Sequence, residues 1–202
     1  MPTLVCALGN VVFDLSPQHA LARWREANDG QLGVSEPRDL QDEALRQFET
    51  GELGESEYAR HLRALLHWRG GDPELVEVFD DMFGPVDLDV VQLLGELRQD
   101  GWQLIGVMNT NPWHEPVWRS LYGPMLEVFD RIHTSTSLRL RLPDHRFLAE
   151  ALRGASGEGL RLFVDHRPEH VTAARSAGMD AHLFRTAARL ASACDALAAP
   201  VL

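Results

Sequence analysis

The sequence predicts an α/β fold: a Rossmann-like, three-layer parallel sheet with a helical cap sub-domain inserted after the first strand. An apolar run near the N-terminus predicts a buried strand, and residues 15–84 then show helical periodicity without a strand pattern. From residue 85 onward, helices and strands alternate, which indicates a parallel sheet because parallel strands need crossover connections. We therefore expect a core formed by residues 1–14 and 85–202, and a cap formed by residues 15–84.

The first strand is expected within the apolar run 4–12, which is broken by Gly9 and Asn10. Ser16 followed by Pro17 marks the start of a helix, since serine is a frequent N-cap and proline suits the first helical position. Glycine and proline punctuate the remaining pattern. It predicts helices at 17–28, 37–49, 55–68, 73–82, 87–98, 143–152, 168–177 and 187–198, and strands at 103–108, 131–135, 161–164 and 180–184.

Charge and composition exclude several classes of partner. The 202-residue chain has a formal net charge of -11, and its 19 basic residues are all arginine. Binding to nucleic acid or to an anionic membrane needs clustered positive charge, so we expect neither partner. The chain lacks a run long enough to span a membrane and has only Cys6 and Cys194, far apart, which favours a cytoplasmic protein without a disulfide framework. A small-molecule partner remains open, as does the oligomeric state.

Ligands of open parallel sheets bind beyond the carboxyl ends of the strands. In this chain that rule selects four short segments, 7–10, 108–111, 139–143 and 165–170. In and beside these segments the sequence reads Leu8-Gly9-Asn10-Val11, Val107-Met108-Asn109-Thr110-Asn111, Arg141-Leu142-Pro143 and Phe163-Val164-Asp165-His166.

These segments resemble, in order along nearly the whole chain, the motifs of the haloacid dehalogenase superfamily, in its branch of small-molecule phosphatases with a helical cap. The branch's corresponding signatures are Phe-Asp-Leu-Gly-Asn-Val, Leu-Ser-Asn-Thr-Asn, Arg-Lys-Pro and Phe-Phe-Asp-Asp. The resemblance extends to the break at Gly51 and Glu52 within the predicted cap. It implies a hydrolase fold, a magnesium cofactor and a crevice between core and cap.

Four motif positions depart from what the resemblance implies. Ala7 stands where the family has an aspartate that attacks phosphorus and binds magnesium, and a methyl group can do neither. Met108 replaces the hydroxyl residue that holds a phosphoryl oxygen, and Leu142 replaces the lysine that neutralises the phosphate. At the fourth motif Asp165 is retained, but its neighbour is His166. Gly9 replaces a second aspartate that many members carry, although the resembling branch also tolerates glycine.

The cofactor that the resemblance implies is therefore not expected. Magnesium prefers oxygen ligands and usually needs a carboxylate pair or a substrate phosphate, whereas Asp165 alone remains. His166 and His170 are spaced four apart with acidic neighbours such as Glu169, and they could ligate a transition metal. The alternative, which we favour, is that these residues are solvated and cap the start of a helix. We expect no tightly bound magnesium, and the two histidines stay a metal-site hypothesis.

Other residues are candidates on weaker patterns. Cys6 neighbours the missing nucleophile, but side chains alternate along a strand, so it should face away from Ala7 and act as a buried hydrophobe. Asp14 lies at the entrance to the cap, where it could face the crevice, cap a helix or pair with an arginine. Trp113 and His114 are expected in a loop beside the crevice, where they either line a pocket or pack structurally. The full set of binding candidates is Asp14, Asn109, Thr110, Trp113, Arg141, Asp165 and His166.

Three functions follow from these patterns. The first is a catalytically inactive protein of this hydrolase superfamily, a pseudo-enzyme with a binding, regulatory or assembly role, because four motif positions lose polarity or charge together. The second is a weak or atypical phosphatase or hydrolase acting on a small molecule through Asp165, His166, Asp14 and a nearby arginine. The third is a transition-metal-binding protein that uses His166 and His170.

Overall fold

A computed structural model describes residues 1–155 and 159–198; residues 156–158 and 199–202 of the predicted core lie outside the described residues. Within the described chain, five parallel strands form one sheet in the order β5-β4-β1-β6-β7. Their bounds are β1 Thr3–Ala7, β4 Gln103–Met108, β5 Arg131–Thr134, β6 Arg161–Asp165 and β7 Asp180–Leu183. Every residue of β1 and β4 is buried, as expected for strands covered on both faces.

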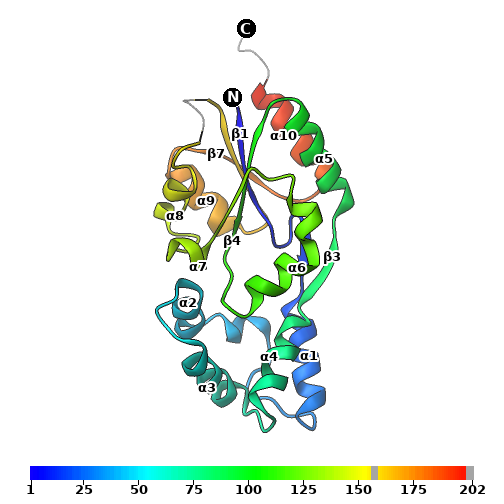
Figure 1. The fold of residues 1–202 in the computed structure, drawn as a ribbon, viewed down its shortest axis with the longest axis vertical. Helices are drawn as coiled ribbons and strands as arrows, with labels where there is room; N and C mark the ends of the chain where they lie inside the picture. The colour runs from blue at the N-terminus through cyan, green and yellow to red at the C-terminus, as the bar shows by residue number, and fades with distance from the viewer. Residues whose placement is uncertain (156–158, 199–202) are drawn as a thin grey trace.

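Helices cover both faces of this sheet (Figure 1). One layer contains α5 Leu88–Gln99, α6 His114–Leu126 and α10 Ala187–Ala198, and the other contains α7 Ser135–Leu138, α8 His145–Ala151 and α9 Pro168–Ser176. Strand β1 serves both layers: Leu4 and Cys6 belong to the first hydrophobic cluster and Val5 to the second. The predicted three-layer α/β fold is confirmed. Among the described helices, none combines the length and the apolarity that crossing a membrane requires.

A separate group of helices lies at the end of the molecule opposite the N-terminus (Figure 1). It consists of α1 Pro17–Ala27, the 3-10 helix η1 Pro37–Leu40, α2 Glu43–Thr50, α3 Glu55–Leu66 and α4 Asp72–Asp80. These helices bury their own hydrophobic cluster, in which fully buried Trp24 donates through Nε1 to the carbonyl oxygen of Leu75 at 3.1 Å. Two short antiparallel strands, β2 Phe13–Leu15 and β3 Phe83–Val86, connect this group to the sheet. We call α1–α4 with η1 the cap; its status as a domain at 15–84 stays a prediction.

Several predicted elements differ from the structure for local reasons. The helix expected at 37–49 is broken, because Asp42 accepts a hydrogen bond from Leu45 N (2.9 Å) and so begins a new helix. Strands β2 and β3 were not predicted, since three or four residues are too few to show an alternating pattern. Helix α6 was also missed, because prolines and a glycine interrupt its pattern; His114 is its first residue, so the loop expected there is wrong.

Removing core volume should destabilise the sheet much more than removing exposed volume. Leu4 is fully buried in β1, whereas the side chain of Leu88 is 69% exposed. Leu4→Ala is expected to lower the free energy of unfolding by about 2–5 kcal/mol, since it leaves a cavity in the centre of the sheet. Leu88→Ala is the matched control and should change it by less than about 0.5 kcal/mol. Urea unfolding followed by circular dichroism measures both, and equal losses would contradict the assigned core.

Candidate functional site

A cavity of about 240 Å³ lies where the cap meets the carboxyl ends of β1, β4 and β6. The cap contributes side chains from η1, α2 and α4, and the sheet contributes the loops that follow its strands. The lining brings together most of the candidate residues from the sequence: Ala7, Gly9, Met108, Asn109, Thr110, Arg141, Leu142, Asp165, His166 and His170. The crevice expected at this edge of the sheet is therefore present in the structure.

Two candidates lie elsewhere. Asp14 is exposed on β2, outside the described lining of the cavity. Trp113 is half-buried against the cap, with ring centroids 4.9 Å from Phe48 and 5.2 Å from Tyr58, and its Nε1 donates to Glu55 Oε2 at 2.9 Å. Of the two roles considered for Trp113, these contacts favour structural packing, and this packing joins the core to the cap.

Apolar, buried residues stand where the motif resemblance implies a nucleophile, a hydroxyl group and a lysine. Ala7 ends β1, and Met108 and Leu142 are 6% and 2% exposed. At Gly9 an added side chain would overlap Leu15, so the space beside this residue is filled by a leucine. These residues give this part of the cavity a hydrophobic surface.

The polar residues retained after β4 are occupied by structural hydrogen bonds. Asn109 accepts from Leu142 N through Oδ1 and donates to the Leu142 carbonyl oxygen through Nδ2, both at 2.9 Å. Thr110 Oγ1 accepts from the indole Nε1 of fully buried Trp118 at 3.1 Å. These two side chains hold neighbouring loops together, which accounts for their presence without a ligand.

Asp165 is buried and surrounded by donors. Its Oδ2 lies 2.7 Å from His170 Nδ1, and its Oδ1 accepts from Arg167 N at 2.8 Å. His166 Nδ1 lies 3.2 Å from Oδ1, without the alignment of a hydrogen bond. Burial opposes ionisation, but His166, His170 and Arg167 N outweigh it and lower the pKa of Asp165 to about 2. The carboxylate is thus ionised at neutral pH, and both of its oxygens are engaged by neighbouring groups of the protein.

This arrangement fits a metal ion poorly. His166 and His170 approach opposite oxygens of the same carboxylate, and His166 Nε2 lies 3.5 Å from Asn10 Nδ2. Within the described part of the chain, no three side chains of the histidine, cysteine, aspartate or glutamate type are grouped to hold a metal. Asp165 is one carboxylate whose two oxygens are already engaged, so the residues present do not form the oxygen cage that magnesium needs.

The sequence missed an ion pair that spans cap and core. Arg141 Nε lies 2.7 Å from Oε2 of Glu49, a residue of α2, and both side chains are largely buried at the cavity. Burial raises the pKa of Glu49 to about 7, although the positive charge of Arg141 opposes the shift. Glu49 gave no sequence signal beyond its place as the last residue of the predicted helix 37–49.

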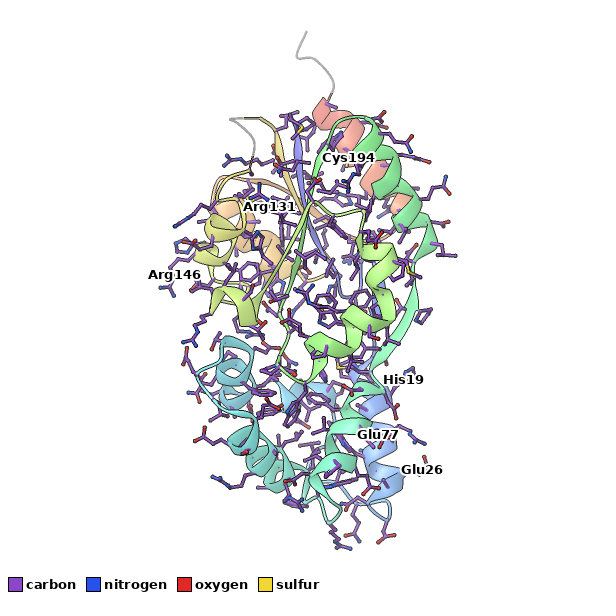
Figure 2. The ribbon with its side chains drawn as sticks, viewed as in Figure 1. His19, Glu26, Glu77, Arg131, Arg146 and Cys194 are labelled. Atoms are coloured by element: carbon purple, nitrogen blue, oxygen red, sulfur yellow. The ribbon has the colours of Figure 1, made fainter. Side chains whose placement is uncertain are left out.

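The two arginines that flank Arg141 in the sequence lie outside the described lining of the cavity. Arg139 and Arg146 are exposed, and Figure 2 shows Arg146 at the outer surface of α8. Arg146 Nε donates to Asp144 Oδ2 at 2.9 Å.

Cys6 is fully buried, its thiol donates to the Ala7 carbonyl oxygen at 3.3 Å, and burial raises the pKa of that thiol. A thiol in this state is a poor nucleophile.

Comparison with known proteins agrees with the fold. No family model matches the sequence. The HAD family enzyme BT-2542 from Bacteroides thetaiotaomicron superposes with a TM-score of 0.78 at 16% identity, over 92% of this chain and 94% of that one. A predicted HAD-like family hydrolase from Porphyromonas gingivalis gives 0.73 at 19% identity, over 90% of each chain. L-2-haloacid dehalogenase from Xanthobacter autotrophicus gives 0.65 at 16% identity, over 90% of this chain and 76% of that one.

The chain therefore has the haloacid dehalogenase-like fold, as the motif resemblance implied. BT-2542 has been crystallised with magnesium, and with magnesium and inorganic phosphate. A variant of that protein in which an aspartate is replaced by alanine has also been crystallised with both.

Asp165 should stabilise the protein only above acidic pH. A carboxyl whose folded pKa of about 2 lies below its ordinary 3.8 contributes stability above pH 3.8 that is lost as the pH falls toward 2. Asp165→Asn is therefore expected to lower the free energy of unfolding by about 2 kcal/mol at pH 7, with a smaller loss at pH 2.5. Urea unfolding at the two pH values measures this, with exposed Asp14→Asn as the control. A loss independent of pH would contradict the role assigned to the carboxylate.

The Glu49–Arg141 pair makes a second pH-dependent prediction. Arg141→Met leaves the Glu49 carboxylate buried without its counter-charge, which should lower the free energy of unfolding by about 3 kcal/mol at pH 8. At pH 5 the loss should be smaller, because Glu49, with a pKa of about 7, is then protonated and uncharged.

Two further variants test the pair. Arg23→Met breaks an exposed pair with Asp81 and should lose less than about 1 kcal/mol at either pH. The double variant Glu49→Met, Arg141→Met should be more stable than Arg141→Met alone at pH 8, because no charge is left buried. If the stability loss of the double variant equals the sum of the losses in Glu49→Met and Arg141→Met, the two residues do not interact.

Proposed function

We propose that this protein is a non-catalytic member of the haloacid dehalogenase-like group, whose crevice binds a small molecule instead of hydrolysing a phosphate ester. One observation carries the proposal: the side chains that would attack and neutralise a phosphate are Ala7 and Leu142, and the charged groups beside them are already paired within the protein.

Phosphoryl transfer needs a nucleophile and positive charge around the phosphate. Ala7 supplies no nucleophile, and Leu142 supplies no cation. The described lining contains two arginines, and each already faces a carboxylate: Arg141 faces Glu49 at 2.7 Å, and Arg167 Nε donates to Glu169 Oε1 at 2.7 Å. A dianion entering this crevice would therefore lose its hydration without gaining a free cation, which is strongly unfavourable.

Loss of the magnesium site is part of the proposal. The alanine variant of BT-2542 was crystallised in complex with magnesium and inorganic phosphate, so that one aspartate-to-alanine change does not by itself prevent that protein from binding both. The proposal for this chain therefore rests on the set of changes. Leu142 removes the cation, and the carboxylate of Asp165 is held by His170 and Arg167 N.

An atypical hydrolase is the second candidate, and a specific contact favours it. Asp165 orients His170 through Nδ1, as a carboxylate orients a histidine that acts as a general base, and His170 lines the cavity. This candidate function lacks a defined nucleophile, since neither Ala7 nor Gly9 carries a reactive group. Its general base is also poorly accessible, because His170 is 5% exposed.

Catalysis assays separate the two candidates. Phosphorylated and halogenated small molecules, incubated with the protein in the presence of magnesium and separately of zinc, are expected to turn over no faster than in buffer alone. Turnover that disappears in Asp165→Asn, with the variant still folded by circular dichroism, would establish the hydrolase and defeat the non-catalytic proposal.

Restoring the missing groups tests the proposal in the opposite direction. The triple variant Ala7→Asp, Met108→Ser, Leu142→Lys is expected to gain phosphate binding in the presence of magnesium, measured by calorimetry, because it regains the nucleophile position, the hydroxyl and the cation. Ala7→Asp alone is the matched control and should gain little. A folded triple variant that binds no phosphate would show that these positions are not the counterparts of the family's motifs.

A further inference from the structure

The cavity has a predominantly apolar wall contributed by both cap and core. Its hydrophobic side chains include Leu15, Leu45, Phe79, Met82, Phe83 and Met108. Ligand cavities of this kind bind apolar molecules and orient them through a few polar groups. Because the charged side chains in the wall are paired, the polar group that selects a ligand must be sought among the uncharged residues.

His114 is such a residue. It lines the cavity, is 5% exposed, and packs between the rings of Phe79 and Phe83, with centroid distances of 4.2 Å and 5.3 Å. Burial lowers the pKa of His114 to about 3, so its imidazole is neutral at physiological pH and carries one N–H.

The hydrogen bonds around His114 assign the position of that proton. Asn111 Oδ1 accepts from the backbone N–H groups of Trp113 (3.1 Å) and His114 (3.0 Å), which fixes the orientation of the amide. Asn111 Nδ2 therefore faces His114 Nδ1, at 3.1 Å, and donates to it. With Nδ1 acting as the acceptor, the proton lies on Nε2.

This Nε2–H group has no hydrogen-bond partner among the described residues, although the atom is buried. Oδ1 of Asp80, at the end of α4, lies 3.9 Å from Nε2 and also lacks a hydrogen-bond partner in the described chain. This oxygen atom is buried, although the Asp80 side chain as a whole is 27% exposed and lies outside the described lining of the cavity. A separation of 3.9 Å is too long for a direct hydrogen bond, but one oxygen atom can contact both groups. Leaving a buried donor and a buried acceptor unsatisfied is costly, so the pair is suited to a bridging oxygen atom.

We propose that the cavity binds an uncharged, mainly apolar small molecule by one oxygen atom, which accepts a hydrogen bond from His114 Nε2. A hydroxyl oxygen in this position also donates to Asp80 Oδ1, so an alcohol satisfies both groups. The inference rests on the proposed binding function and adds to it the class of ligand and the residue that selects it. Phosphate monoesters are disfavoured, because the apolar part of such an ester could enter the cavity only if the phosphate dianion lost its hydration.

Three probes with the same ring system test this ligand class: 2-naphthol, 2-methylnaphthalene and 2-naphthyl phosphate. Titration of the purified protein at pH 7, followed by fluorescence, is expected to show 2-naphthol binding about tenfold more tightly than 2-methylnaphthalene. It should also bind more tightly than 2-naphthyl phosphate. In His114→Phe the advantage of 2-naphthol over 2-methylnaphthalene should disappear, whereas His19→Phe, on the outer side of α1 (Figure 2), should retain it.

A measurement on the unmodified protein covers the case in which His114→Phe fails to fold. The Nε2–H resonance of His114, observed by nuclear magnetic resonance, should shift with 2-naphthol and stay in place with 2-methylnaphthalene. If 2-naphthol binds no more tightly than 2-methylnaphthalene and leaves this resonance in place, the inference is wrong. A water molecule then bridges His114 Nε2 and Asp80 Oδ1. The third probe separates the two proposals, since hydrolysis of 2-naphthyl phosphate with magnesium would defeat the non-catalytic function, whereas tighter binding of the ester without hydrolysis would defeat only the ligand class.

Discussion

The central position of β1 constrains everything else in this molecule. It pairs with β4 on one side and β6 on the other, and its side chains are buried in both helical layers. A parallel strand in this place aligns three carboxyl ends at one edge of the sheet, so residues about 100 and 160 positions apart become neighbours. Ala7, Met108 and Asp165 meet at the cavity for this reason alone.

The charged groups that line this crevice are already paired within the protein. Each charged group in its described lining has a partner of opposite charge or a donor within the protein: Arg141 has Glu49, Arg167 has Glu169, and Asp165 has His170. A site organised in this way gains little from binding an anion or a cation. Its apolar wall and its unpaired imidazole N–H remain as the features that a ligand could exploit.

An ion pair in the crevice wall and an aromatic contact outside it hold the cap against the core. Glu49 of α2 reaches Arg141 from the cap side, and Trp113, just before α6, packs on Phe48 and Tyr58 of the cap. Helix α2 also packs against α7 of the core. Because Glu49 and Arg141 both line the cavity, the proposed ligand would lie beside one of the contacts that attach the cap.

Sequence periodicity alone determined the sheet, most of its helices and the run of helices that follows the first strand. Strand and helix patterns are local, and the alternation of the two requires a parallel sheet. The sequence also determined that Ala7 and Leu142 bring no charge to the site, since that depends only on residue type. Tertiary structure decided the rest. That Glu49 meets Arg141, that His170 holds Asp165, and that Trp113 joins the cap while Asp14 stays exposed all depend on how distant segments approach one another. Hydrogen-bond satisfaction is likewise a property of the assembled site, so the unpaired Nε2–H of His114 could not be read from a chain in which His114 was expected in a loop.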